Sequence, residues 1–147
     1  MHAPITATET RPLRHAVLRP SQPADRLIYP GDDDALHLGV RDDTGELVAV
    51  ASFYDEPVPG TTEPAARIRG MATLPAHRGL GHGRRLVEHG LAILTERVGR
   101  EPTLWCNART TAAGYYAKLG FQQRGGEFDI TAIGPHVVMV RAPGSGM

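Results

Sequence analysis

The hydrophobic period of the chain changes from that of a strand to that of a helix across one short, glycine-rich stretch. Before it, Ile68, Gly70 and Ala72 alternate with more polar residues, as a strand requires. After it, apolar residues recur at three- and four-residue steps over Arg84–Val98, which predicts an amphipathic helix that Gly99 ends. A strand that leads through a loop into a helix is typical of mixed α/β folds.

Shorter apolar runs predict the other elements. His37–Arg41 and Leu47–Phe53 flank the turn composition Asp42–Gly45 and indicate a hairpin. Further strands and a helix are predicted at Thr103–Cys106, from Thr110 or Thr111 to Leu119, from Phe121 to Gln123, and at His136–Arg141. Residues 125–135 are interpreted as a loop or an irregular hairpin connection. This order predicts a mixed α/β sheet of at most seven strands with at least one parallel pair.

Residues 1–147 fit one domain, because no internal repeat or linker divides them. Residues 1–10 and 142–147 are small, polar or helix-breaking, so we expect both ends to be flexible. A short helical piece between Leu13 and Tyr29 is interrupted by prolines. The carboxylates of Asp32–Asp34 diverge in a turn, so a solvated cluster is favoured over a cation site.

The charge balance excludes some classes of partner. Sixteen basic and sixteen acidic side chains cancel, so no overall field attracts nucleic acid or an anionic membrane. A single cysteine excludes an intramolecular disulfide, and the first residues lack the apolar run of a signal peptide. We therefore expect a cytoplasmic protein. His77 and His82 have no third ligand at recognisable spacing, so we expect no metal.

The glycine-rich stretch itself predicts an anion-binding loop. Gly79, Gly81 and Gly83 allow the main-chain N–H groups to turn inward, and the helix that follows adds the positive end of its dipole. A pyrophosphate suits such a loop, although a plain tight turn has the same composition. A P-loop would need Gly-Lys-Ser/Thr, and a dinucleotide loop Gly-x-Gly-x-x-Gly. Neither pattern is present, since Arg84 and Arg85 follow the last glycine.

Two motifs resemble those of a known superfamily. The pattern Arg-x-x-Gly-x-Gly at Arg78, Gly81 and Gly83 resembles the coenzyme A signature of the GNAT superfamily of N-acyltransferases. Asn107 and the run Ala113–Phe121, with its tyrosines and terminal Gly-Phe, are similar to the second signature of that superfamily. The motifs occur in the family's order, separated by one amphipathic helix, and the resemblance covers Ile68 to Phe121.

The resemblance implies a fold. A GNAT-like domain has a mixed, mostly antiparallel sheet of six to seven strands with helices on both faces. Its two central parallel strands splay apart in a V, and the pantetheine arm of coenzyme A pairs with the exposed main chain. The first thirty residues match the family poorly and form a short N-terminal helical region, so the resemblance does not identify the acceptor.

The resemblance also implies cofactor-binding residues. Acetyl-CoA would be the co-substrate, with the main chain of Met71, Ala72 and Thr73 near its thioester. The other residues implied in binding are Arg78, Gly79, Leu80, Gly81, His82, Gly83, Arg84, Asn107 and Tyr116. Asn107 would hydrogen-bond the pantetheine amide or orient Tyr116, and as an alternative it only closes a turn at the strand end.

The same resemblance implies a general acid. Tyr116 stands five residues before Phe121, the family's position for the tyrosine that protonates the thiolate. A phenol with a pKa near ~10 is protonated at neutral pH. Tyr115 points about 100° away around the helix and is interpreted as packing. The base is open between Glu127, His136 and a water chain, with Asp129 nearby. Cys106 is interpreted as a core residue.

Three functions remain as hypotheses. The first is a GNAT-type N-acetyltransferase that acts on a primary amine of a small molecule or a protein. The second is a non-catalytic acyl-CoA-binding sensor or interaction domain. The third is a nucleotide-binding regulatory module that uses the same loop. A homodimer, in which a partner completes the short N-terminal side, is compatible with each of them.

Overall fold

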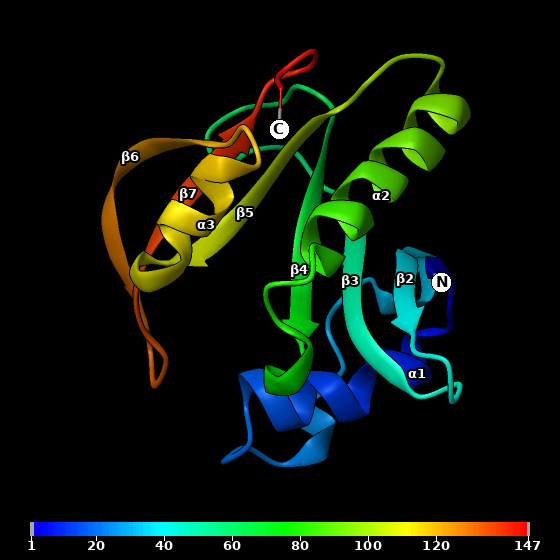
Figure 1. Cartoon of the computed structure of the whole chain (residues 1–147). Helices are drawn as coiled ribbons and strands as arrows, with labels where there is room; N and C mark the ends of the chain where they lie inside the picture. Colours follow the sequence, from blue (N-terminus) through cyan, green and yellow to red (C-terminus); the bar gives the residue numbers. More distant parts are fainter. Residues whose placement is uncertain (1, 147) are drawn as a thin grey trace. The chain divides into compact units, whose positions relative to one another are not determined.

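A computed structural model describes residues 2–146. Its elements can be followed along the colour ramp of Figure 1. The strands are β1 (His2–Pro4), β2 (Leu36–Arg41), β3 (Leu47–Asp55), β4 (Ala65–Thr73), β5 (Thr103–Arg109), β6 (Gln122–Ile130) and β7 (Gly134–Arg141). The α-helices are α1 (Ala7–Leu13), α2 (His82–Val98) and α3 (Ala113–Lys118). Shorter helical turns lie at Arg14–Leu18, Ala24–Leu27, Asp32–Asp34, Pro75–His77 and Thr110–Ala112.

The seven strands form one sheet in the order β1-β2-β3-β4-β5-β7-β6. Strand β4 pairs in parallel with β5, Ala65 opposite Thr103 and Arg67 opposite Trp105. The β1–β2, β2–β3, β5–β7 and β6–β7 pairs are antiparallel. A parallel pair needs a long crossover, which here contains α2. The prediction of a mixed, mostly antiparallel sheet with a parallel pair is confirmed.

The residues divide into two compact units. The first comprises the chain up to Tyr54 together with Ile68–Ile93, and the second comprises Asp55–Arg67 and the chain from Leu94 onward. Strands β3 and β4 and helix α2 each contribute to both units, because the three boundaries fall inside them. No helix within residues 2–146 combines the length and the hydropathy that crossing a bilayer requires.

In the first unit, helices cover both faces of the sheet. Leu13 of α1 packs with Val50 of β3 and Ala72 of β4. Gly90 of α2 lies against the Phe53 ring so closely that a Cβ there would be 2.3 Å from the ring. Residues three apart on a strand project to opposite faces, so Val50 and Phe53 face opposite ways. Helices α1 and α2 therefore pack on opposite sides of β3.

In the second unit, Trp105 of β5 organises the core. Its ring is 1% exposed and packs with Val58, Ala65 and Val140. The indole Nε1–H donates to the carbonyl of Glu56 at 2.8 Å, which satisfies the one polar group of the side chain. The core thereby ties the segment before β4 to β5. Helix α3 packs against β5, β6 and β7.

Residues 125–130 belong to a strand, which corrects part of the predicted loop at 125–135. Strand β6 runs through Gly125 and Gly126 to Ile130, and its register against β7 shifts between Arg124 and Phe128. It is the last strand of the sheet, and all its residues before Ile130 are exposed. An edge strand with a bulge and no buried face carries no alternating apolar pattern. The sequence signal was absent for that reason.

Regular structure also begins earlier than Leu13, the first position at which we expected it. Helix α1 starts after Thr6, whose side chain accepts a hydrogen bond from the Glu9 N–H at 3.2 Å. The Glu9 carboxylate in turn accepts from the Thr6 N–H at 2.8 Å. This capping box satisfies two N–H groups that the first helical turn leaves open. Its Thr-x-x-Glu signature was readable in the sequence.

Candidate functional site

The predicted anion-binding loop connects β4 to α2 in the first unit. A single 3₁₀ turn at Pro75–His77 leads into it, and α2 begins at His82, two residues before the predicted start. Gly79 and Gly81 have φ angles of +78° and +81°, in the left-handed region that side chains with a Cβ rarely adopt. The path of the loop therefore depends on glycine at both positions.

The charges around this loop favour an anion. The N–H groups in the first turn of α2 have no acceptor within the helix and form its positive end. Arg78 donates from Nε to the carbonyl of Thr73 at 3.3 Å, and Arg85 donates to the carbonyl of Leu80 at 2.9 Å. Both guanidinium groups are thereby held at the loop. Burial, and then the charge of Arg85, lower the pKa of His82. Sequence reasoning placed Arg84 here and missed Arg85.

Strand β4 leads into the loop through the residues implied in thioester binding. Ala72 is buried in the apolar cluster of the first unit, and Met71 and Thr73 are half-buried. Gly70, immediately before Met71, has a φ of +64°. The extended conformation of β4 is therefore interrupted at Gly70, directly before Met71–Thr73, whose main chain is expected to bind the thioester.

Asn107 provides a buried acceptor in the second unit. It lies on β5 opposite Val138 of β7. Its Oδ1 is buried and has no hydrogen-bond partner within residues 2–146. An unmet buried acceptor costs about 1–3 kcal/mol, and a ligand N–H can remove that cost. Oδ1 accepts no hydrogen bond from Tyr116.

Tyr116 of α3 bonds to Cys106 instead. Its hydroxyl donates to the Cys106 sulfur, and its ring meets Phe121 edge to face at 5.5 Å between centroids. Burial, followed by the neighbouring Cys106, raises the pKa of Tyr116 well above its ordinary value. The phenol is therefore protonated at neutral pH, as a general acid must be. Tyr115 is 45% exposed and touches the Tyr116 ring at its edge.

Cys106 is a core residue, which confirms the interpretation from sequence. It is 3% exposed, and burial raises the pKa of its thiol to about 12. Only the thiolate is nucleophilic, so the side chain has no role as a nucleophile. The sequence did not reveal that this thiol contacts Tyr116.

We expect Cys106 to resist alkylation in the native protein. At pH 8 a thiol with a pKa near 12 is ionised in about one part in 10⁴, and burial blocks the reagent as well. Iodoacetamide, followed by intact-mass spectrometry, should leave the folded protein unmodified and should label it fully in urea. Stoichiometric labelling without urea would contradict both the burial and the raised pKa.

The base candidates lie on the hairpin of β6 and β7. Glu127 and Asp129 are exposed residues of β6, whereas His136 of β7 is 3% exposed. The Nδ1–H of His136 donates to the carbonyl of Gly134 at 2.8 Å. Since a carbonyl only accepts, the neutral ring keeps Nε2 as its proton acceptor. The structure thus puts a solvated carboxylate and a buried imidazole on adjacent strands.

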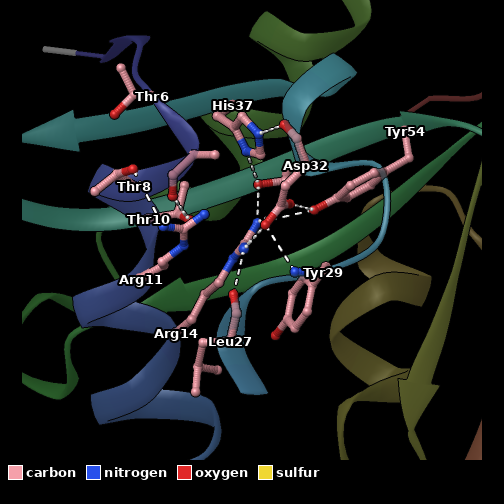
Figure 2. Close-up of polar contacts among 12 residues, drawn as sticks. Thr6, Thr8, Thr10, Arg11, Arg14, Leu27, Tyr29, Asp32, His37 and Tyr54 are labelled. Atoms are coloured by element: carbon pink, nitrogen blue, oxygen red, sulfur yellow. Dashed lines mark hydrogen bonds and ion pairs between the residues drawn. The ribbon is translucent and has the colours of Figure 1, made fainter. Parts of the chain in front are cut away.

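A buried arginine cluster in the first unit was not predicted. It consists of Arg14, Asp32, His37, Ser52 and Tyr54, of which all but Ser52 are labelled in Figure 2. Asp32 is 4% exposed and ion-paired with Arg14 at 2.9 Å, so the prediction that it belongs to a solvated cluster is wrong. Burial opposes its ionisation, but hydrogen bonds from Arg14 and Tyr54 outweigh burial and lower its pKa. Burial and the bond to Asp32 raise the pKa of Tyr54.

Part of this cluster resembles a hydrolase triad without its chemistry. Ser52 lies 2.6 Å from His37 Nδ1, and His37 Nε2 donates to the main-chain carbonyl of Asp32 at 2.8 Å. Ser52 is fully buried and also accepts from Arg14 at 2.9 Å. A nucleophile must reach its substrate, so this serine is structural. Within residues 2–146, no group of three or more His, Cys, Asp or Glu side chains is placed to hold a metal ion.

Comparisons with known proteins give consistent results. The model of the acetyltransferase (GNAT) family matches residues 5–121. The chain is 41% identical over 140 residues to a Bacillus subtilis (strain 168) protein named "Uncharacterized N-acetyltransferase YitI", covering 93% of this chain and 92% of that one. An acyl-CoA N-acyltransferase structure from Pseudomonas aeruginosa aligns with TM-score 0.71 and 25% identity, over 97% of this chain and 99% of that one.

A further solved structure shares the fold at lower identity. It is an aminoglycoside 6'-N-acetyltransferase complexed with coenzyme A, with a TM-score of 0.70 and 14% identity. The alignment covers 96% of each chain. At this identity the likeness concerns the fold.

Proposed function

Because this chain belongs to the GNAT acetyltransferase family and is an acyl-CoA-dependent N-acetyltransferase, we propose that it transfers acetyl from acetyl-CoA to a primary amine. The loop before α2 is the main observation in favour of acetyl-CoA as the co-substrate. There, two glycines with positive φ precede a helix N-terminus flanked by Arg78 and Arg85. That combination suits the diphosphate of coenzyme A.

Several groups of the chain have the chemistry that this co-substrate requires. In the first unit, the main-chain N–H groups of Gly79–Arg84 and the Arg78 side chain bind the diphosphate. The main chain at Met71–Thr73 binds the pantetheine arm and the thioester. In the second unit, Asn107 Oδ1 accepts from a pantetheine amide, a role supported by its buried and unmet acceptor atom.

The reaction is a direct transfer. The neutral amine attacks the thioester carbonyl, forming the C–N bond, and the C–S bond then breaks. A main-chain N–H at Met71 or Ala72 stabilises the negative charge that develops on the carbonyl oxygen. Tyr116 gives its proton to the departing thiolate, and the amine loses its proton to His136 Nε2, Glu127 or water. The presence of Tyr116 and Asn107 at the family's positions supports catalysis over a non-catalytic acyl-CoA-binding role.

We expect acetyl-CoA to stabilise the protein selectively. At about 100 times Kd, a ligand that binds only the folded state raises Tm by roughly 5–10 °C for a chain of this size. Differential scanning fluorimetry with acetyl-CoA, NAD and ATP checks this, and detection of free thiol with a panel of amines identifies the acceptor class. Stabilisation by NAD or ATP alone would favour the nucleotide-binding module instead.

A glycine variant makes the same experiment specific to the loop. Gly79→Ala should weaken acetyl-CoA binding about 5- to 30-fold, because alanine in the left-handed region costs about 1–2 kcal/mol. Gly60→Ala is the matched control, since Gly60 has a φ of +82° and, as at Gly79, an added Cβ meets open space. Isothermal titration calorimetry should show unchanged affinity for the control. An equal loss of acetyl-CoA affinity in both variants would contradict the proposal that this loop binds the diphosphate.

A further inference from the structure

We propose that Arg14 is a positioning residue. Its buried side chain packs against Gly70 and thereby fixes the conformation of the β4 main chain at Arg69–Met71. The inference rests on the proposed function, in which a main-chain N–H at Met71 or Ala72 binds the thioester oxygen. It adds a residue far from both family signatures, on the helical turn that follows α1.

Arg14 is held so firmly that it can act as a fixed support. Its side chain is fully buried. One terminal nitrogen donates to the Leu27 carbonyl and to Asp32 Oδ2, both at 2.9 Å. The other donates to Asp32 Oδ1 at 3.2 Å, Ser52 at 2.9 Å and Tyr54 at 3.0 Å. The planar fork is thus fixed at both ends, as Figure 2 shows for its labelled partners.

The contact with β4 explains why one nitrogen of Arg14 lacks an acceptor. Nε is buried and makes no hydrogen bond within residues 2–146. It faces Gly70, where a Cβ would lie 2.8 Å from Nε and 3.2 Å from Tyr29 Cε2. Close packing against glycine has therefore replaced a hydrogen bond at this atom. Both the positive φ of Gly70 and the absence of its side chain are required for that packing.

A second contact ties the preceding residue of β4 to the same support. The Tyr29 ring has the Arg14 guanidinium at 4.2 Å and the Arg69 guanidinium at 4.4 Å from its centroid. The Tyr29 N–H donates to Asp32 Oδ2 at 2.9 Å, which ties Tyr29 to the cluster. Arg69 and Gly70 thus rest on one rigid assembly. The main chain at Gly70 cannot straighten without displacing Arg14 or Tyr29.

The consequence for the reaction is specific. A displacement of about 1 Å in a group that acts on the transition state can cost about 10²-fold in rate. The diphosphate loop contacts other residues, since its arginines bond to Thr73 and Leu80. A change at Arg14 should therefore reduce kcat by a larger factor than it weakens the affinity for coenzyme A, whose diphosphate is held by the loop.

Arg14→Lys tests this, because lysine keeps the charge and loses the fork. Arg141→Lys is the matched control: Arg141 is 3% exposed, bonds to Glu101 and the Leu119 carbonyl, and belongs to β7. Turnover is measured per folded molecule, with the folded fraction from circular dichroism, and coenzyme A affinity by calorimetry. We expect kcat to fall about 10²-fold only in Arg14→Lys, with a much smaller loss of coenzyme A affinity. Equal losses of kcat in both variants would overturn the inference.

Two further measurements keep the inference testable. In ¹⁵N spectra, Arg14→Lys should shift the amides of Arg69–Ala72 in addition to those of the direct hydrogen-bond partners of Arg14, and unchanged amides at Arg69–Ala72 would overturn the inference. Gly70→Ala should also lower kcat, and the double variant should lose less than the product of the two single losses, because both changes act on one contact. A loss of kcat in the double variant equal to the product of the two single losses would contradict a contact between Arg14 and Gly70. If the wild type neither binds coenzyme A nor acetylates amines, the proposed function fails and the spectra alone decide the role of Arg14.

Discussion

Tyr116→Phe should lower the rate of acetyl transfer by about 10²- to 10⁴-fold while acetyl-CoA binds as tightly as before. The variant keeps the ring against Phe121 and removes only the hydroxyl that donates to Cys106. Without that proton, the departing thiolate must leave as an anion. Stopped-flow measurement of thiol release at saturating amine gives the rate, and calorimetry gives the affinity.

Tyr115→Phe is the control, since Tyr115 is the neighbouring tyrosine and is 45% exposed. It should leave the rate unchanged. The pH profile adds a second readout: burial raises the pKa of Tyr116 far above its ordinary value, so the acid form persists. No loss of rate from ionisation of Tyr116 is expected up to about pH 10. A wild-type rate in Tyr116→Phe, with chemistry rate-limiting, would remove the tyrosine from the mechanism.

Asp32→Ala should lower the free energy of unfolding by about 3–5 kcal/mol. The substitution leaves the buried guanidinium of Arg14 without its counter-charge, and the Tyr54 hydroxyl and Tyr29 N–H lose their acceptor. An uncompensated buried charge is among the most costly single changes. Urea unfolding followed by circular dichroism measures the loss.

Asp33→Ala is the matched control, because Asp33 is the next residue in the same turn and is exposed. Its effect should stay within about 0.5 kcal/mol. Since the folded-state pKa of Asp32 is lowered, the ion pair stabilises the protein fully above about pH 4, and this stability is lost as pH falls through the folded-state pKa. In Asp32→Ala, the free energy of unfolding should not show the decrease at low pH that protonation of Asp32 causes in the wild type. Equal stability of the two alanine variants would contradict the role of the ion pair.

Elements that bury apolar side chains were predictable from the sequence. Strand β4 and helix α2 bury apolar side chains at the period of their own backbone, whereas β3 is buried on both faces and is recognised as a continuous apolar run. Strand β6 was only half recognised because it is exposed along its length and contains a register shift. The start of α1 was missed although its capping box is a local signal.

The candidate site divides in the same way. The diphosphate loop was recognisable because the positive φ of Gly79 and Gly81 is a local property that favours glycine. The link between Cys106 and Tyr116, and the position of Arg85 over the Leu80 carbonyl, were not recognised. Side-chain partners of this kind depend on which strand lies beside which helix, and on rotamers that a motif does not specify.

The sequence by itself determined the order of the strands and helices from β2 to β7, the glycine loop and the family. Each of these depends on residues close together along the chain, whose backbone angles and periodicity are set locally. The tertiary structure alone decided the partners of Arg14, which come from positions 13 to 40 residues away. A buried charge must find its acceptors wherever folding brings them, since leaving it unpaired costs more than the chain's stability allows. The need to pair the buried Arg14 therefore decides its contacts, and no local sequence pattern predicts them.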